Sequence, residues 1–232
     1  MGIPPVYANI FSSVKNLSMY SVKNTSSPMS VTNALAWLHD PTLIAAVNEL
    51  NNIAFDKSDI AYLQNMGAYA PYSSGSEAVN FIKDANLRIT FAPMQSKHTH
   101  AQYEYDKNTI MINDIYRGAT DFPVILAIAE AILHEAGHAK DYDGDSSIQE
   151  ELDFLGMNAI AHRAFTKKYG DIFKGYDELI VKDGVSIYEK LFFAPNPEKD
   201  ALVKRVRTKY GYLPAGDHLH PPGNLALIIK NN

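Results

Sequence analysis

Hydrophobic residues recur with a helical period over much of the chain between residues 30 and 85. Apolar positions lie three and four apart, and Pro41 and Ser58 stand where helices commonly begin. The pattern predicts helices over residues 30–40, 41–55 and 58–69, then a loop over 71–77 and a short helix that ends near residue 85. Residues 1–30 show no sustained period, so we expect an irregular arm there.

The period changes to two in the middle of the chain. Three runs rich in β-branched and aromatic residues predict strands over residues 87–93, 100–106 and 108–114. The tripeptide DKN between the last two runs is typical of a hairpin turn. We therefore expect a small mixed or antiparallel sheet.

A long helix is predicted directly after the sheet. The segment TDFPVILAIAEAILHEAGHAKDYDG offers Thr120 or Asp121 as a cap, has Pro123 in its first turn and ends before Gly144. A second helix is predicted over residues 148–168. The remaining predicted elements are helices over 176–192 and 198–209, a Pro- and Gly-rich loop over 211–224, and a final strand or buried segment, LALIIK.

These elements indicate a mainly helical α+β fold with a small sheet beside the long helix. A chain of 232 residues with 46% hydrophobic residues can bury a substantial core, and we expect one domain over residues 1–232. Its expected parts are the arm over 1–30, a helical part over 31–86, the sheet with the two long helices over 87–168, and a C-terminal helical part with a loop over 169–232.

Composition narrows the kinds of partner and of metal ligand. The formal net charge is -5 and basic residues form no stripe, which argues against a nucleic-acid partner. No run of about 18 apolar residues occurs, so we expect no transmembrane segment. Without cysteine, only His and carboxylate side chains can hold a metal ion. Val6, Tyr7 and Ala8 resemble the end of a cleaved secretion signal, which favours a secreted or extracytoplasmic location over the cytoplasm.

The long helix carries the motif HEAGH, formed by His134, Glu135 and His138 with Gly137 between them. The two histidines lie one turn apart on the same side of a helix, so both imidazoles can reach one metal ion. Glu135 projects beside them toward a metal-bound water. Gly137 leaves room for a close neighbour, at a helix-propensity cost of about 1 kcal/mol. We expect this side of the helix to face a cleft.

A catalytic zinc ion needs a third protein ligand and one open position for water. The candidate acids are Asp141, Glu150, Glu151 and Asp153. Asp141 lies one turn beyond His138 and is better placed to accept the second ring N–H of that histidine than to bind the metal. Ser147 and Glu150 form a capping-box pattern, which gives Glu150 a structural role at the start of the second helix.

Glu151 and Asp153 remain as candidates for the third ligand. The apolar stripe of the second helix consists of Ile148, Leu152, Leu155 and Ala159. Glu151 flanks this stripe and so points toward the first helix, whereas Asp153 points away from it. Both His138 and Glu151 lie within roughly 10 Å of the corner between the helices. The pattern therefore favours Glu151, with Asp153 as the main rival.

The segment HEAGHAKDY, followed by a Glu on the next helix, resembles the zincin metallopeptidases, and among them the gluzincins, whose ligands are two His and one Glu. The resemblance covers residues 109–165 at most. It implies a zincin-like fold and a bound Zn²⁺, with His134, His138 and Glu151 as ligands and Glu135 as the general base. NTIMIND also resembles the zincin edge strand, which holds an extended peptide substrate by backbone pairing.

Two departures from the family pattern concern the metal ligands. The chain lacks the third His of the metzincin motif. It also lacks the small residue and the acid or Asn that several gluzincin families carry three and four positions after the Glu. Asp153 fits one such pattern better through Gly156, and so the identity of the third ligand stays open at the level of sequence.

Other His and Tyr residues are weaker candidates for contacts with a substrate. Four of them, in or beside the C-terminal loop, are candidates to hydrogen-bond an oxyanion: Tyr210, Tyr212, His218 and His220. Another four, around the second strand, are candidates to line substrate subsites: His98, His100, Tyr103 and Tyr105. Neighbouring prolines and strand alternation also explain these residues without any such role.

The sequence thus predicts a zinc-dependent peptidase that acts on a peptide or protein substrate. An alternative is a non-catalytic zinc-binding module that recognises a partner on a peptidase scaffold. Glu135 argues against this alternative, because a pure binder has no need of a general base. A structural protein without metal is a further alternative, and it would leave His134 and His138 without a role.

Overall fold

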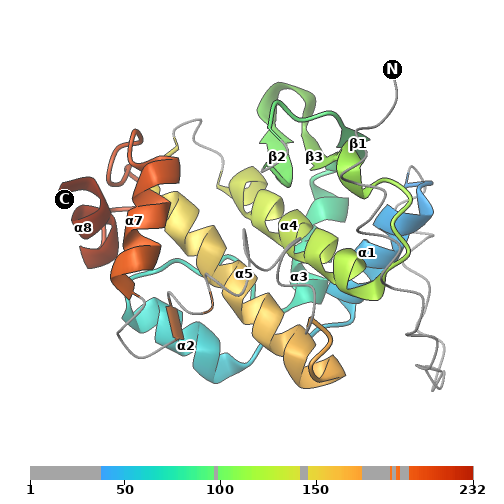
Figure 1. Cartoon of the computed structure of the whole chain (residues 1–232), viewed down its shortest axis with the longest axis horizontal. Helices are drawn as coiled ribbons and strands as arrows, with labels where there is room; N and C mark the ends of the chain where they lie inside the picture. The colour runs from blue at the N-terminus through green and yellow to red at the C-terminus, as the bar shows by residue number, and fades with distance from the viewer. Residues whose placement is uncertain are drawn as a thin grey trace. The chain divides into compact units, whose positions relative to one another are not determined.

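The computed structural model describes residues 38–96, 99–141, 146–173, 189, 192–193 and 199–231. The chain divides into a unit of residues 1–30, which lies outside the described residues, and a compact unit of residues 31–232. Most of the predicted helices over 30–40 and 176–192 also lies outside. In the described part, seven α-helices accompany one three-stranded mixed sheet, which confirms a mainly helical α+β fold (Figure 1).

Three helices precede the sheet: α1 (Pro41–Asn51), α2 (Lys57–Asn65) and α3 (Gly75–Asp84). A side-chain cap fixes where each of them begins. Asp40 accepts the backbone N–H of Thr42, Asp56 accepts that of Ser58, and Ser74 accepts that of Glu77. The first two helices end about four residues earlier than the sequence pattern predicts, and α3 begins inside the segment predicted as a loop. Apolar residues continue past the helix ends because the connecting segments are partly buried as well.

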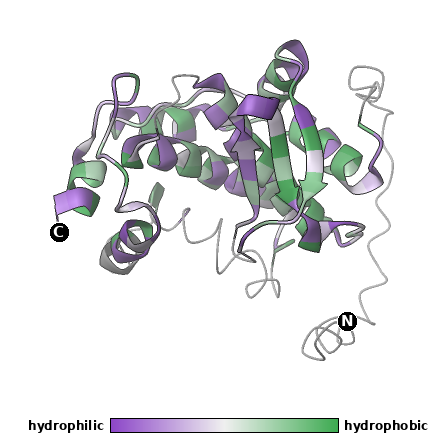
Figure 2. Cartoon of the chain, turned by 90° about the horizontal axis from the view of Figure 1, so that it is seen from above, coloured by the Kyte–Doolittle hydropathy of each residue, from purple (hydrophilic) through white to green (hydrophobic). Residues whose placement is uncertain are grey.

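The sheet consists of β1 (Arg88–Ala92), β2 (Ala101–Glu104) and β3 (Thr109–Asn113), in the order β1-β3-β2. β1 pairs with β3 in parallel and β2 pairs with β3 in antiparallel fashion. The prediction that NTIMIND is an edge strand is therefore wrong, because β1 occupies the second side of β3. In Figure 2 this central strand is mostly hydrophobic, whereas the edge strand β2 is mostly hydrophilic.

The two long helices are α4 (Phe122–Lys140) and α5 (Ile148–Tyr169), close to the predicted limits. They pack antiparallel, and α4 also contacts α1, α3, β2 and β3, so it lies at the centre of the described structure (Figure 1). By length and composition α4 could cross a membrane, but 83% of its most apolar stretch is buried within the protein. Such burial is typical of the core helix of a globular domain.

Two helices follow near the C-terminus, α7 (Lys199–Tyr210) and α8 (Asn224–Asn231), joined by a loop over residues 211–223. The prediction of a strand for LALIIK is wrong, because this segment forms most of α8. Its buried residues, Ala226 and Ile229, are three apart and face α5 and α7. A short apolar run shows no period long enough to separate helix from strand, so only packing decides between them.

Gly137 and Phe154 make a close contact between α4 and α5. A Cβ atom on Gly137 would lie 2.5 Å from the ring of Phe154, and that ring is fully buried. The space that Gly137 leaves in α4 is thus filled by Phe154 of α5. This contact is the close neighbour that the glycine in HEAGH predicts, and its packing offsets the poor helix propensity of glycine.

We predict that Gly137→Ala destabilises the protein by about 1–2 kcal/mol, because overpacking a tight core contact outweighs the gain in helix propensity. Urea unfolding monitored by circular dichroism measures the change. Gly156→Ala is the matched control, since its Cβ would meet a terminal methyl group of Leu63 at 2.9 Å rather than the face of a ring, and a methyl group at the end of a side chain shifts at lower cost. A Gly137→Ala protein as stable as the wild type would contradict the expectation.

Candidate metal centre

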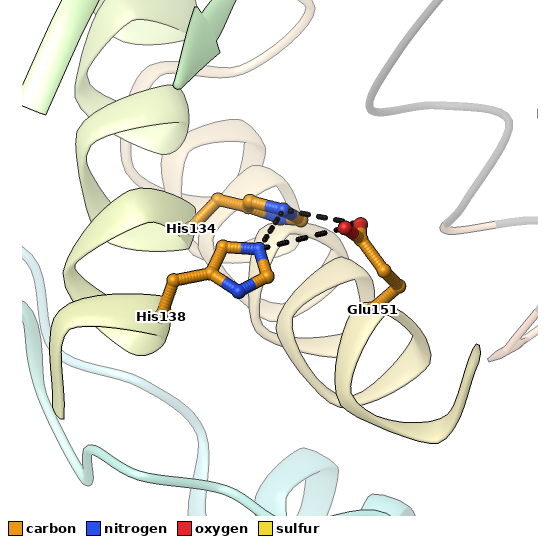
Figure 3. A group of neighbouring side chains, drawn as sticks. All are labelled: His134, His138 and Glu151. Atoms are coloured by element: carbon orange, nitrogen blue, oxygen red, sulfur yellow. Dashed lines mark hydrogen bonds and ion pairs between the residues drawn. The ribbon is translucent and has the colours of Figure 1, made fainter. Parts of the chain in front are cut away.

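Three side chains from α4 and α5 converge on one point: His134, His138 and Glu151 (Figure 3). The Nε2 atoms of the two histidines are 3.2 Å apart. The Glu151 carboxylate straddles them, with Oε2 3.6 Å from His134 Nε2 and Oε1 3.7 Å from His138 Nε2. The structure thus brings together the two histidines and the acid that the sequence pattern favours as third ligand.

These separations suit a zinc ion. Four ligands about 2.0–2.1 Å from a tetrahedral zinc lie roughly 3.3–3.5 Å from one another, close to the spacing of these atoms. Glu151 Oε2 is buried and has no hydrogen-bond partner among the described residues, although a buried carboxylate oxygen normally has one. Two imidazole nitrogens and a carboxylate form a ligand set that zinc accepts, and with three protein ligands a fourth position stays open for water.

Glu150, the neighbour of Glu151, has two roles. It completes the predicted capping box, because Glu150 N donates to Ser147 Oγ at 3.1 Å and Ser147 N donates to Glu150 Oε2 at 3.3 Å. Its other oxygen, Oε1, lies 2.5 Å from His138 Nδ1. Glu150 therefore also orients the imidazole of His138 from the side opposite to Glu151.

Asp141 does not lie beside the second ring nitrogen of His138, so the prediction that it orients this histidine is wrong. Glu150 occupies the Nδ1 side of that imidazole. Asp141 is the C-cap residue of α4, where the backbone has left the helix at φ -89° and ψ 79°. Its carboxylate consequently turns toward the C-terminal loop, with Oδ2 2.8 Å from His220 Nε2.

The charges of the centre are coupled. Burial alone lowers the pKa of His138, but its hydrogen bond with Glu150 and the charges of Glu151 and Glu135 raise it to about 9. Burial alone raises the pKa of Glu151, but the interactions with His134 and His138 lower it to about 2. A metal ion needs a neutral imidazole as ligand, so a metal bound here would have to displace the proton from His138.

Glu135 lies between the histidines and the edge of the sheet. It is 8% exposed, and its Oε2 accepts the backbone N–H of Tyr103 in β2 at 2.8 Å. Asn113 N donates to His100 O at 2.9 Å, so these two residues form a hydrogen-bonded pair. Such pairs alternate along an antiparallel ladder, and in the β2–β3 register the next ones from β2 are Gln102 and Glu104. The backbone groups of Ala101 and Tyr103 consequently point to the outer edge, which meets Glu135.

Asp153 and His220 lie together in a buried cluster behind the centre. Asp153 Oδ2 is 2.6 Å from His220 Nδ1, and Asp153 Oδ1 accepts Gln149 Nε2 at 2.6 Å. Burial alone lowers the pKa of His220, but Asp153 and Asp141 raise it to about 9. His220 is thus a cation held between two carboxylates, rather than a loop histidine fixed by its prolines.

The other weaker candidates are spread over several places. Tyr103 contributes its backbone N–H to Glu135, while its hydroxyl donates to Asn108. Tyr212 is 79% exposed and His218 is also exposed, so their contact with a substrate stays a prediction. His98 lies outside the described residues.

A second buried pair, Glu130 and His162, extends the polar contact between α4 and α5. His162 Nδ1 is 3.3 Å from Glu130 Oε1, and Glu130 is fully buried. Burial raises the pKa of Glu130. A signal for Glu130 is present in the sequence, because Glu130, His134 and His138 recur every four positions along one side of α4.

Comparison of the chain with protein-family models, with curated proteins and with solved structures finds no match. The chemistry of this centre must therefore be inferred from its own residues.

We predict that Glu151→Gln lowers zinc affinity more than about 100-fold, because it removes the anionic ligand. Loss of a residue that only hydrogen-bonds to a metal ligand lowers affinity by about 10- to 100-fold. Glu150→Gln, which keeps an acceptor for His138, is expected at the lower end of that range. Competition with a fluorescent zinc chelator measures both. Retained affinity in Glu151→Gln together with loss in Asp153→Asn would identify Asp153 as the ligand instead.

Proposed function

We propose that this chain is a zinc-dependent metallopeptidase with a zincin-like arrangement of its active site. The observation that carries the proposal is the placement of Glu135. It lies one residue from a ligand histidine and touches the outer edge of β2 through the N–H of Tyr103. A candidate metal centre, a carboxylate able to act as a base and the outer edge of a strand thus meet at one place.

The proposed reaction is hydrolysis of a peptide bond. His134, His138 and Glu151 would hold the zinc ion, which when bound supplies Lewis-acid activation of water and of the scissile carbonyl. Glu135 accepts a proton from the attacking water and returns it to the leaving nitrogen. Glu150 keeps the imidazole of His138 in place throughout, because Ser147 fixes the carboxylate of Glu150 at the start of α5.

The edge of β2 supports a peptide as the class of substrate. An extended peptide can add to an exposed strand edge through main-chain hydrogen bonds. Ala101 and Tyr103 direct their backbone groups to that edge, and the N–H of Tyr103 lies 2.8 Å from Glu135. A peptide paired along β2 therefore runs directly past the proposed base. We therefore assign backbone pairing with the substrate to β2, and not to β3 as the sequence resemblance indicates.

The alternative of a zinc-binding recognition module shares the metal centre but makes no use of Glu135. In that case the buried carboxylate of Glu135 would serve only as an acceptor for the N–H of Tyr103. A metal-free structural role would leave Glu151 Oε2 buried without a hydrogen-bond partner among the described residues. Zinc content and turnover distinguish these alternatives.

We predict that Glu135→Gln keeps zinc affinity but lowers kcat for peptide hydrolysis by about 10²–10⁴-fold, because the amide cannot accept the proton. Cleavage of a mixture of unstructured peptides, followed by mass spectrometry, identifies a substrate and then measures the rate. Glu104→Gln in β2 is the matched control and should keep activity. Full activity of Glu135→Gln would exclude Glu135 as the base, and a wild type that binds zinc without cleaving any peptide would favour the recognition module.

The edge-strand part of the proposal has its own test in Ala101→Pro. Proline removes the N–H at a position whose N–H points away from β3, so the ladder of the sheet stays intact. We expect KM for a cleaved peptide to rise about 3- to 10-fold, the effect of one lost backbone hydrogen bond, with zinc affinity unchanged. An unchanged KM in a folded variant would show that the substrate does not pair at this position.

A further inference from the structure

We propose that the loop over residues 211–223 is a brace that sets the geometry of the metal centre, with His220 as its positioning residue. This inference rests on the proposed zinc site. The loop is remote in sequence from the HEAGH motif, and residues 142–145, which join α4 to α5, lie outside the described part of the chain. The brace consists of three sets of contacts between this loop and the corner of the two helices.

The first set of contacts caps the start of α5. The first backbone N–H groups of a helix have no partner within the helix itself. Ile148 N donates to Pro214 O at 2.8 Å, and Gln149 N donates to Ala215 O at 3.1 Å. The loop therefore supplies acceptors for the first turn of α5, the same turn that carries Glu150 and Glu151.

The second set of contacts joins both helices through His220. Its Nε2 lies 2.8 Å from Asp141 Oδ2 at the end of α4, and its Nδ1 lies 2.6 Å from Asp153 Oδ2 in α5. All three side chains are at most 3% exposed. One imidazole thus bridges the end of α4 to the first turns of α5.

The third set of contacts holds the loop itself in shape. His220 N donates to Asp217 Oδ1 at 2.6 Å, and Asp217 N donates to His220 O at 3.0 Å. A Cβ atom on Gly216 would lie 2.5 Å from His220 O, so the loop closes tightly around its own turn. Gly223 N then donates to the Gln149 side chain at 2.9 Å, which ties the end of the loop to α5.

These contacts lie on both sides of the proposed ligands. On α5 the brace holds residues 149 and 153, with Glu150 and Glu151 between them, and on α4 it holds Asp141, three residues after His138. The separation of ligand atoms on the two helices therefore depends on the loop. Since coupling between two sites is reciprocal, bound zinc must also stabilise the docked loop.

The test compares His220→Gln with His218→Gln, the same substitution in the same loop at an exposed position. We expect His220→Gln to lower zinc affinity about tenfold and His218→Gln to keep it. The expected loss is at the lower end of the range for removing a direct hydrogen-bond partner of a ligand, because His220 acts through the positions of the two helices. The visible absorption of the Co²⁺-loaded proteins should change in His220→Gln alone, because it reports ligand geometry. In the wild type, zinc should slow proteolysis within residues 211–223.

Each outcome decides one point. If the wild type binds no zinc, the proposed function fails. If it binds zinc, and His220→Gln has the same affinity and the same Co²⁺ spectrum, the brace is wrong while the zinc site stands. Should His220→Gln fail to fold, Asp141→Asn takes its place in the test, because the Asn side chain keeps an acceptor for His220 Nε2. We expect a smaller loss of zinc affinity in Asp141→Asn. Unchanged zinc affinity in that variant would also overturn the brace.

Discussion

The ring of Phe154 packed against Gly137 is the contact on which the candidate metal centre depends. It allows α4 and α5 to approach closely beside His138. The same ring meets three imidazoles edge-on, with centroid distances of 4.6 Å to His138, 6.0 Å to His134 and 5.9 Å to His220. One buried aromatic side chain thus supports both histidines of the centre and the histidine that joins the helix ends.

Two adjacent glutamates take opposite sides of one imidazole because of where α5 begins. Glu150 is bound at the helix start by Ser147, so its second oxygen faces His138 Nδ1. Glu151 follows by about 100° around the helix and faces Nε2. The capping box therefore engages the carboxylate of Glu150 and leaves Glu151 as the acid that faces both Nε2 atoms. This dependence links an ordinary capping box to the chemistry of the centre.

The sheet contributes through its order as much as through its residues. Because β1 and β2 pair with the two sides of β3, β2 is the strand of the sheet that turns an outer edge to Glu135, which it meets at Tyr103. Two further groups of buried carboxylates and histidines lie along α4, one on each side of the candidate metal centre. Glu130 pairs with His162 toward the start of the helix, and Asp141 pairs with His220 at its end. The described helices are therefore held together by hydrogen-bonded charges as well as by apolar packing.

Local patterns in the sequence determined most helices and strands, the HEAGH pair, the capping box, the small residue at position 137 and the direction of Glu151, since each depends on residues within about two helical turns. Contacts between distant segments decided the rest. Strand order, the helix at LALIIK, and the partners of Asp141, Asp153 and His220 required α4, α5 and the C-terminal loop to be packed together. A charged side chain takes its partner from whatever packs beside it, and helical periodicity carries no information about that neighbour.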